Sequence, residues 1–294
     1  MKPTVKNTIP VFDICALSQP GYLQEQVIAE RFADYLDARP GLHAAHRHSF
    51  YHLVLFSKGG GMHSIDFEHF TVRPGSIYFM RPGQVHSWQF KGKPDGYIVN
   101  FSGHLFDQVL KEQQYPEQFS FFRGVASESV LQLSPTVYKE AVYLLEQLLV
   151  ENGQTANTPM ICALLMNLFI RIERECAPVA SKAAANGQMV LQQFRKLLDT
   201  HYRQLRLPKD YAAMLYITPN HLNALCKDLL GKPAGTLIRD RVLLEAKRLL
   251  VNADLQVAEI AWQLHFEDNS YFSRFFKKYT GQSPEAFRKD HSIH

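Results

Sequence analysis

The sequence predicts a two-domain α+β protein, with an N-terminal β-barrel flanked by helices and a C-terminal domain built only of helices. Short apolar runs between glycine and proline residues fill positions 46–101, whereas amphipathic helical patterns fill most of the chain after Gln188. The stretch 177–187 between them is small, polar and without apolar periodicity. We therefore expect one domain at 1–176, a linker at 177–187 and a second domain at 188–294.

Length and composition are those of an ordinary globular protein. A chain of 294 residues is long enough for two domains with separate cores, and its 46% hydrophobic content is unremarkable for this class. The four cysteines form no CxxC pair, which argues against a zinc knuckle or a redox motif. No signal peptide opens the sequence and no uncharged apolar run reaches membrane-spanning length, so we expect a cytoplasmic protein without a membrane partner.

The net charge of +4 is unevenly distributed along the chain. Residues 188–294 carry 16 Lys and Arg against 11 Asp and Glu, whereas residues 1–187 carry 16 against 17. The basic excess therefore belongs to the helical domain, as a phosphate-binding unit requires. Because the excess is small, it supports such a function without establishing it.

In the N-terminal domain, one helix is predicted before a series of strands. Helical spacing of apolar residues from Val27 to Leu36 predicts a helix that ends at Pro40-Gly41. The runs HLVLF, HSIDF, SIYFM and YIVNF then predict strands, and KGGG, RPG, RPGQ and GKPDG predict the turns between them. This spacing favours a small antiparallel barrel or sandwich.

Two amphipathic helices are predicted after the strands. The first carries an apolar stripe at Ala141, Leu144, Leu145 and Leu148. The second starts at Thr158-Pro159 and carries a stronger stripe, at Ile161, Leu164, Leu165, Leu168, Phe169 and Ile172. Two interpretations remain open at this point: both stripes pack on the barrel, or one of them forms a dimer interface.

The helical domain contains one pattern twice, fifty residues apart. The first copy is AMLYITPNHLNALCKDLLGKP, and the second is IAWQLHFEDNSYFSRFFKKYTGQSP. Thr218 and Asp268 occupy equivalent positions, and each is a favourable N-cap for a helix that follows a short helix and a tight turn. A single copy is explained well enough by a solvated face on a helical bundle. Two copies in one small domain favour two DNA-reading helices that enter successive major-groove segments of one duplex.

In each copy the second helix has an apolar face toward its domain and a polar face of residue types that contact DNA. Asn pairs bidentately with adenine, Arg pairs with guanine, and Lys near the helix end suits phosphate. The predicted DNA-binding residues are Thr218, Asn220, His221, Asn223, Ala224 and Lys227 in the first copy, and Asn269, Ser270, Ser273, Arg274, Lys277 and Lys278 in the second.

Residues 188–290 resemble the DNA-binding domain of the AraC/XylS family of bacterial transcription regulators. The most specific part of the resemblance is the segment from Asn269 to Lys278, followed by Gly281 and Pro284. It implies a homodimeric regulator, more often an activator than a repressor, that binds promoter DNA and contacts RNA polymerase. Two departures are visible: Ala224 stands where the family often has Arg, and Tyr216 and His265 replace a small turn residue.

Histidines are concentrated in the predicted barrel, where eight of the thirteen lie between His43 and His104. The segment HRHSFYH groups His46, His48 and His52, which strand alternation places on one side. A barrel of this size can hold one small ligand. The predicted effector contacts are His46, His48, His52, Tyr78, His86 and Trp88, with Tyr51 as a further candidate.

These histidine segments resemble the two motifs of the cupin barrel, which carry HxH with an acidic ligand and then a His after a glycine turn. Carried over, the resemblance implies His46, His48 and His86 as metal ligands, but His52 stands where the acidic ligand is expected. Regulators of this architecture usually keep the barrel as a sensor without metal. We therefore expect no metal and no cofactor, and an effector that is a small metabolite such as a sugar.

The sequence thus predicts a DNA-binding transcription regulator controlled by a small-molecule effector, and not an enzyme. Two alternatives remain: a metal-dependent cupin enzyme tethered to DNA, and a constitutive DNA-binding protein whose barrel is purely structural.

Overall fold

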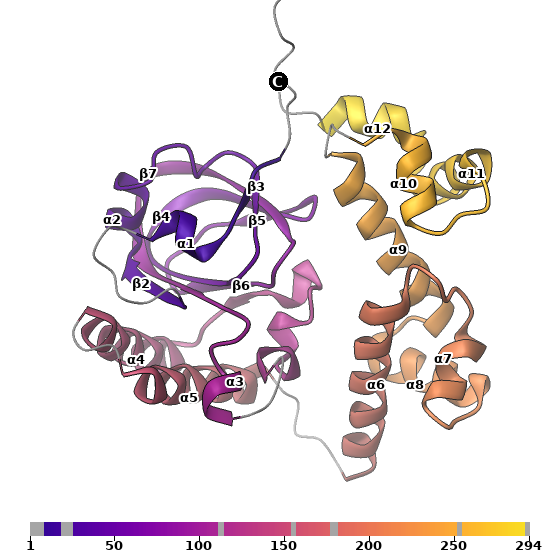
Figure 1. The fold of residues 1–294 in the computed structure, drawn as a ribbon. Coiled ribbons are helices and arrows are strands. Elements are labelled where there is room, and N and C mark those ends of the chain that lie inside the picture. Colours follow the sequence, from indigo (N-terminus) through magenta and orange to yellow (C-terminus); the bar gives the residue numbers. More distant parts are fainter. Residues whose placement is uncertain are drawn as a thin grey trace, which may run out of the picture. The chain divides into compact units, whose positions relative to one another are not determined.

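The computed structural model describes residues 9–18, 26–110, 115–153, 157–176, 182–251 and 255–291. The chain forms two compact units, one of Pro10–Pro178 and one that contains Val179–His294 (Figure 1). The first part of the expected linker 177–187 lies outside the described residues, but helix α6 (Lys182–His201) begins inside it. The helix extends into the expected linker because Ala183, Ala184 and Ala185 are strong helix formers.

Two long strands organise the N-terminal unit. β4 (Tyr51–Ile65) and β7 (Val85–Phe101) pair with each other along most of their length, and each contributes one half to each of two layers. The first layer contains the first half of β4 and the last half of β7. These segments combine there with β2 (Val27–Arg31), β6 (Ser76–Met80) and β8 (Val130–Gln132). The second combines their other halves with β1 (Val11–Phe12), β3 (His46–His48) and β5 (Glu68–Thr71). This arrangement agrees with the predicted barrel or sandwich (Figure 1).

Glycines mark the places where the two long strands change layer. The register shifts between Phe56 and Gly60 in β4, and a Cβ atom on Gly96 of β7 would lie 1.9 Å from the Leu55 carbonyl oxygen. The predicted turns at KGGG and GKPDG are therefore wrong. These segments are irregular stretches of paired strand, in which Lys58 lies opposite Asp95. Glycine suits a bulge as well as it suits a turn, so local composition does not separate the two.

The helix predicted from Val27 to Leu36 is also wrong in its first half. Val27–Arg31 forms β2, which pairs with β7, and only Phe32–Asp37 forms a helix, α2. A short apolar run fits a buried strand and a helix equally well, and β-branched residues such as Val27 and Ile28 favour the strand once a partner is available.

Helices α4 (Pro135–Gly153) and α5 (Thr158–Cys176) pack on the outer face of the first layer. Strand residues alternate accordingly: Leu53 and Leu55 pack with the helices, whereas Val54 and Phe56 face the interior between the layers. Both predicted apolar stripes are part of this helix-facing core, so the first of the two interpretations is confirmed. Short helices complete the unit, namely α1 (Ile14–Leu17), α3 (Asp107–Leu110), η1 (Tyr115–Gln118), η2 (Ser120–Phe122) and η3 (Ala126–Glu128).

The second unit consists of helices, with α9 (Ala234–Leu250) packed against both repeated helix pairs (Figure 1). The first pair is α7 (Pro208–Met214) with α8 (Pro219–Leu230), and the second is α10 (Val257–Gln263) with α11 (Asn269–Thr280), followed by α12 (Pro284–His291). None of the helices in the described residues is both long and apolar enough to cross a membrane.

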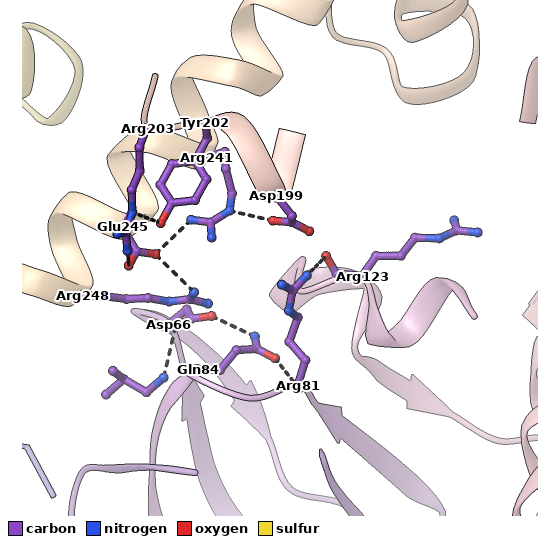
Figure 2. A network of polar contacts seen from close by, with 11 residues as sticks. Asp66, Arg81, Gln84, Arg123, Asp199, Tyr202, Arg203, Arg241, Glu245 and Arg248 are labelled. Atoms are coloured by element: carbon purple, nitrogen blue, oxygen red, sulfur yellow. Dashed lines mark hydrogen bonds and ion pairs between the residues drawn. The ribbon is translucent and has the colours of Figure 1, made fainter. Parts of the chain in front are cut away.

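A charged network fastens α6 to α9. Figure 2 shows the Arg241 guanidinium between the carboxylates of Asp199, at 2.8 Å, and Glu245, at 3.0 Å. The same guanidinium lies over the ring of Tyr202, with 3.9 Å to the ring centroid. Burial opposes ionisation of Glu245, but the positive charges of Arg241 and Arg248 outweigh it and lower the pKa of that carboxyl. The network therefore stays ionised near neutral pH and fixes α6 on α9.

Replacing Gly96 by alanine tests the β4–β7 bend. Gly96→Ala combines positive-φ strain with a clash against the Leu55 carbonyl, so we expect it to lower the free energy of unfolding by about 3 kcal/mol or more. Gly92→Ala is the matched control, because it also has positive φ but no neighbouring atom within 4 Å, and should cost about 1 kcal/mol. Urea unfolding followed by fluorescence reports on this unit, since Trp88 is buried and Trp262 is exposed. Equal losses in the two variants would contradict the clash.

Candidate DNA-reading helices and effector site

The first helix pair is joined by a tight turn with a left-handed residue. Tyr216 adopts φ 55°, and the Ile217 N–H donates to the Ala212 carbonyl, which closes the end of α7. Thr218 then accepts a hydrogen bond from the His221 N–H at 3.1 Å and starts α8, as the sequence predicts. Tyr216 occupies this position at a strain of about 1 kcal/mol, and its side chain is almost fully exposed.

The second pair repeats this geometry with one extra residue. His265 adopts φ 53°, the Phe266 N–H donates to the Ala261 carbonyl, and Asp268 caps α11 through the Tyr271 N–H at 2.6 Å. The first helices of the two pairs are therefore 49 residues apart, whereas the reading helices are 50 apart. The substitutions at Tyr216 and His265 leave the same turn hydrogen bonds in both copies.

Helix α8 presents a mildly polar face to solvent. Asn220, Ala224 and Lys227 follow the i, i+4, i+7 spacing of a single helix face and are exposed, and His221 is exposed beside them. Asn223 is placed differently: its side-chain oxygen accepts a hydrogen bond from the backbone N–H of Ala234 at 3.1 Å. This bond supplies the start of α9 with a cap, because Pro233 has none to offer. The Asn223 oxygen is thereby occupied within the protein.

Helix α11 presents a more basic face. Ser270, Arg274 and Lys277 follow the same i, i+4, i+7 spacing and are exposed, with Asn269 and Lys278 exposed beside them. Ser273 is half-buried. The helix contains no acidic residue, and its apolar face is held by Phe272 and Phe276, which are fully buried. Of the two predicted surfaces, this one matches the chemistry of nucleic-acid contact more closely.

The six predicted effector residues all lie inside the barrel and are buried there. The ring centroids of His46 and His86 are 4.1 Å apart, those of His48 and His52 are 5.0 Å apart, and Trp88 lies 4.9 Å from His86. Tyr78 joins the group through His63, with centroids 4.8 Å apart. The structure therefore brings these residues together as one cluster of aromatic and imidazole rings.

Burial keeps the imidazoles neutral. Loss of solvation lowers the pKa of His46 to about 4, against the opposing effect of its hydrogen bond to the Ala44 carbonyl. It lowers the pKa of His52 to about 3, against the opposing bond to Asn100. The pKa values of His48, His63 and His86 are also lowered by burial and by their imidazole neighbours. Near neutral pH the cluster therefore offers uncharged nitrogen atoms, which serve as hydrogen-bonding groups or as metal ligands.

Two details of this cluster differ from the sequence prediction. Tyr51 does not line the interior: it stacks on Phe101 on the helix-facing side, as alternation from His52 requires. His63 was missed, although it is fully buried and lies 3.1 Å from His86 through ring nitrogens. The pairing of His63 with Trp88 puts it in the cluster, and that long-range register is not visible in the sequence.

Comparison with known proteins finds a matching domain family for each of the two units. Residues 35–188, more than half of the chain, match the family described as AraC-like ligand binding domain, and residues 211–290 match a helix-turn-helix domain. The chain belongs to the AraC/XylS family. It is a DNA-binding transcription regulator with an effector-binding domain.

Among curated relatives, the chain is similar to the HTH-type transcriptional activator RhaS of Klebsiella pneumoniae (strain 342), with 22% identity over 83% of this chain and 87% of the relative. RhaS of Salmonella schwarzengrund (strain CVM19633) is 24% identical over the same shares. Among solved structures, the C-terminal domain of AraT from Geobacillus stearothermophilus is 27% identical, with a TM-score of 0.34, over 36% of this chain and 88% of that domain. ToxT of Vibrio cholerae with bound unsaturated fatty acid is 11% identical, with a TM-score of 0.44, over 90% and 95%.

Arg274 is the first residue to test for base recognition. Arg274→Ala should weaken binding to the cognate site by about 1–3 kcal/mol and relax one base preference, because a guanidinium pairs bidentately with guanine. Arg274→Lys keeps the positive charge but lacks the planar guanidinium group that donates two parallel hydrogen bonds. This variant should therefore lose the base preference and retain the salt dependence. Titrations against a set of single-base operator variants measure both effects. Unchanged preferences in both variants would remove Arg274 from base recognition.

Lys277 should contact phosphate instead of bases. Lys277→Ala is expected to weaken binding to every sequence alike and to reduce the slope of log K against log salt by about 1. Lys139→Ala, an exposed lysine of the N-terminal unit, removes the same charge and serves as the control. A loss confined to particular sequences would show that Lys277 recognises bases.

Proposed function

We propose that the protein binds promoter DNA through the exposed faces of α8 and α11, which enter successive major-groove segments of one duplex. The observation that carries this proposal is the repeated geometry: two capped helices, each following a short helix and a left-handed turn, are braced by the same helix α9. The proposed contacts are the predicted residues of both helices. The single exception is the Asn223 oxygen, which the Ala234 N–H engages.

The proposed effector site is the interior of the barrel, at His46, His48, His52, Tyr78, His86 and Trp88. Its support is the convergence of these side chains on one buried cluster with neutral imidazoles. The effector is a small molecule, and its binding shifts the population of the regulator toward the form that activates transcription. The matched relatives are transcription regulators, which supports a sensing barrel over a catalytic one.

The proposed setting is that of a homodimer in the cytoplasm that activates its promoter by contacting RNA polymerase. Because the main apolar stripes of α4 and α5 are used inside the chain, a dimer contact on these helices would have to use their other positions. Tyr143, Val150 and Met160 are exposed there and are available for it. The constitutive alternative, in which the barrel only supports the fold, is separated from this proposal by whether any ligand changes DNA affinity.

A binding selection from genomic fragments with the purified full-length protein tests the proposal. The DNA bound at two salt concentrations is sequenced, and we expect an enriched motif with two contacted segments about one helical turn apart. The recovered sites also identify regulated genes and supply operators for the variant titrations. Binding without an enriched motif, lost uniformly as salt rises, would contradict sequence-specific regulation.

A further inference from the structure

Three buried histidines of the cluster place their ring nitrogen atoms close to one another. His46, His48 and His86 each place a ring nitrogen within 4.8 Å of the other two, and all three residues are buried. The Nε2 atoms of His48 and His86 are 3.5 Å apart. Two nitrogen ligands of a tetrahedral zinc ion, each at 2.0–2.1 Å from the metal, are separated by about 3.4 Å. This pair therefore already has the separation of two ligands on one ion.

The hydrogen bonds of His46 fix which of its nitrogens is free. Its Nδ1 lies 2.7 Å from the Ala44 carbonyl oxygen, which only accepts, so Nδ1 carries the proton. Its Nε2 then holds a lone pair that is buried and has no hydrogen-bond partner among the described residues. An imidazole that donates one N–H to a carbonyl and presents the other nitrogen is the usual arrangement of a metal-bound histidine.

His52 and His86 are oriented in a comparable way. Asn100 donates to the Tyr35 hydroxyl, which turns its side-chain oxygen toward Nδ1 of His52 at 2.6 Å. The Nε2 atom of His52 is buried and has no partner among the described residues. His86 contacts Nε2 of His63 through its Nδ1 at 3.1 Å, so its own Nε2 points to His48. A proton on Nδ1 of His86, donated to His63, leaves Nε2 of His86 free for an ion.

We propose that His46, His48 and His86 bind one divalent first-row transition-metal ion, and that this ion forms part of the effector signal. His63 acts as a positioning residue for His86. An all-imidazole set selects ions such as Zn²⁺, Ni²⁺ and Cu²⁺ over Mg²⁺ and Ca²⁺, which prefer oxygen ligands. His52 lies beside two of the ligands, with its ring centroid 5.0 Å from that of His48 and 5.4 Å from that of His86. The regulatory half of this inference rests on the proposed function, whereas the binding half does not.

The binding half is tested on the full-length protein after removal of metal by chelation and dialysis. Equilibrium dialysis against ZnCl₂ should give one bound ion per chain, and Co²⁺ should give an absorption spectrum of low coordination number. Both should be lost in His86→Ala and in His46→Ala. His104→Ala removes an exposed histidine and should bind as the parent does. His63→Leu should bind about 10–100-fold more weakly if His63 orients His86.

Folding of each variant is checked by the fluorescence of buried Trp88 and by circular dichroism. If His86→Ala does not fold, the cluster is tested by His46→Gln and by competition of Zn²⁺ with Co²⁺ in the parent. The metal site would be overturned if the parent bound no stoichiometric Zn²⁺. It would also be overturned if the folded His46 and His86 variants bound Zn²⁺ as well as the parent does.

The regulatory half is tested by operator titrations with and without ZnCl₂. We expect Zn²⁺ to change the operator affinity of the parent and of His104→Ala, and to leave that of the folded His86 variant unchanged. Stoichiometric Zn²⁺ binding without any change in affinity would overturn the ion as a signal and retain the site. Sequence-specific DNA binding without Zn²⁺ binding would overturn the metal site and retain the proposed function. Bound Zn²⁺ without sequence-specific DNA binding would overturn the proposed function and retain the metal site.

Discussion

The pairing of β4 with β7 is the constraint on which the N-terminal unit depends. Because both strands pass from one layer to the other while staying paired, their register decides which side chains face the interior and which face α4 and α5. His63 lies opposite Trp88, and His86 lies opposite His46 on β3. A shift of one residue would exchange the two faces, moving the histidines toward the helices and the leucines toward the effector site. The glycines that permit the bends therefore determine the chemistry of the barrel as much as its shape.

In the helical unit, α9 has the corresponding role. The Arg241 guanidinium binds carboxylates of both α6 and α9, and Asn223 of α8 caps the first turn of α9. On the other side, the Arg206 guanidinium donates to the Leu264 carbonyl and lies 4.4 Å from the Phe266 ring centroid, so it fixes the second turn. The first helix pair is therefore tied to α9 through Asn223, and the second turn is tied through Arg206 to the segment before α7. Rigid support of this kind is what a surface needs if it is to meet two groove segments in a fixed relation.

Local features were predictable from the sequence and long-range ones were not. Thr218 and Asp268 were identified as N-caps because a cap depends only on residues within three positions of each other. The stripes of α4 and α5 were visible because helical periodicity is sustained over many residues. The glycine-rich segments were misjudged because a bulge and a turn share one composition. His63 and Asn223 depend on partners 23 and 11 residues away, and nothing in their own neighbourhood specifies those contacts.

The two reading helices differ in charge, and we expect this difference to give them different contacts with DNA in the proposed interface. Helix α8 carries Lys227 beside Asp228, so these charges cancel, whereas α11 carries Arg274, Lys277 and Lys278 with no acidic residue. Release of counterions from DNA scales with the number of phosphates neutralised, so we expect α11 to account for most of the salt-dependent affinity. Since the Asn223 oxygen caps α9 and Ala224 can offer bases only an apolar contact, we expect the hydrogen bonds from α8 to bases to come from Asn220 and His221. Hydrogen bonds to bases depend little on salt, so we expect a rise in ionic strength to weaken the contacts of α11 before those of α8.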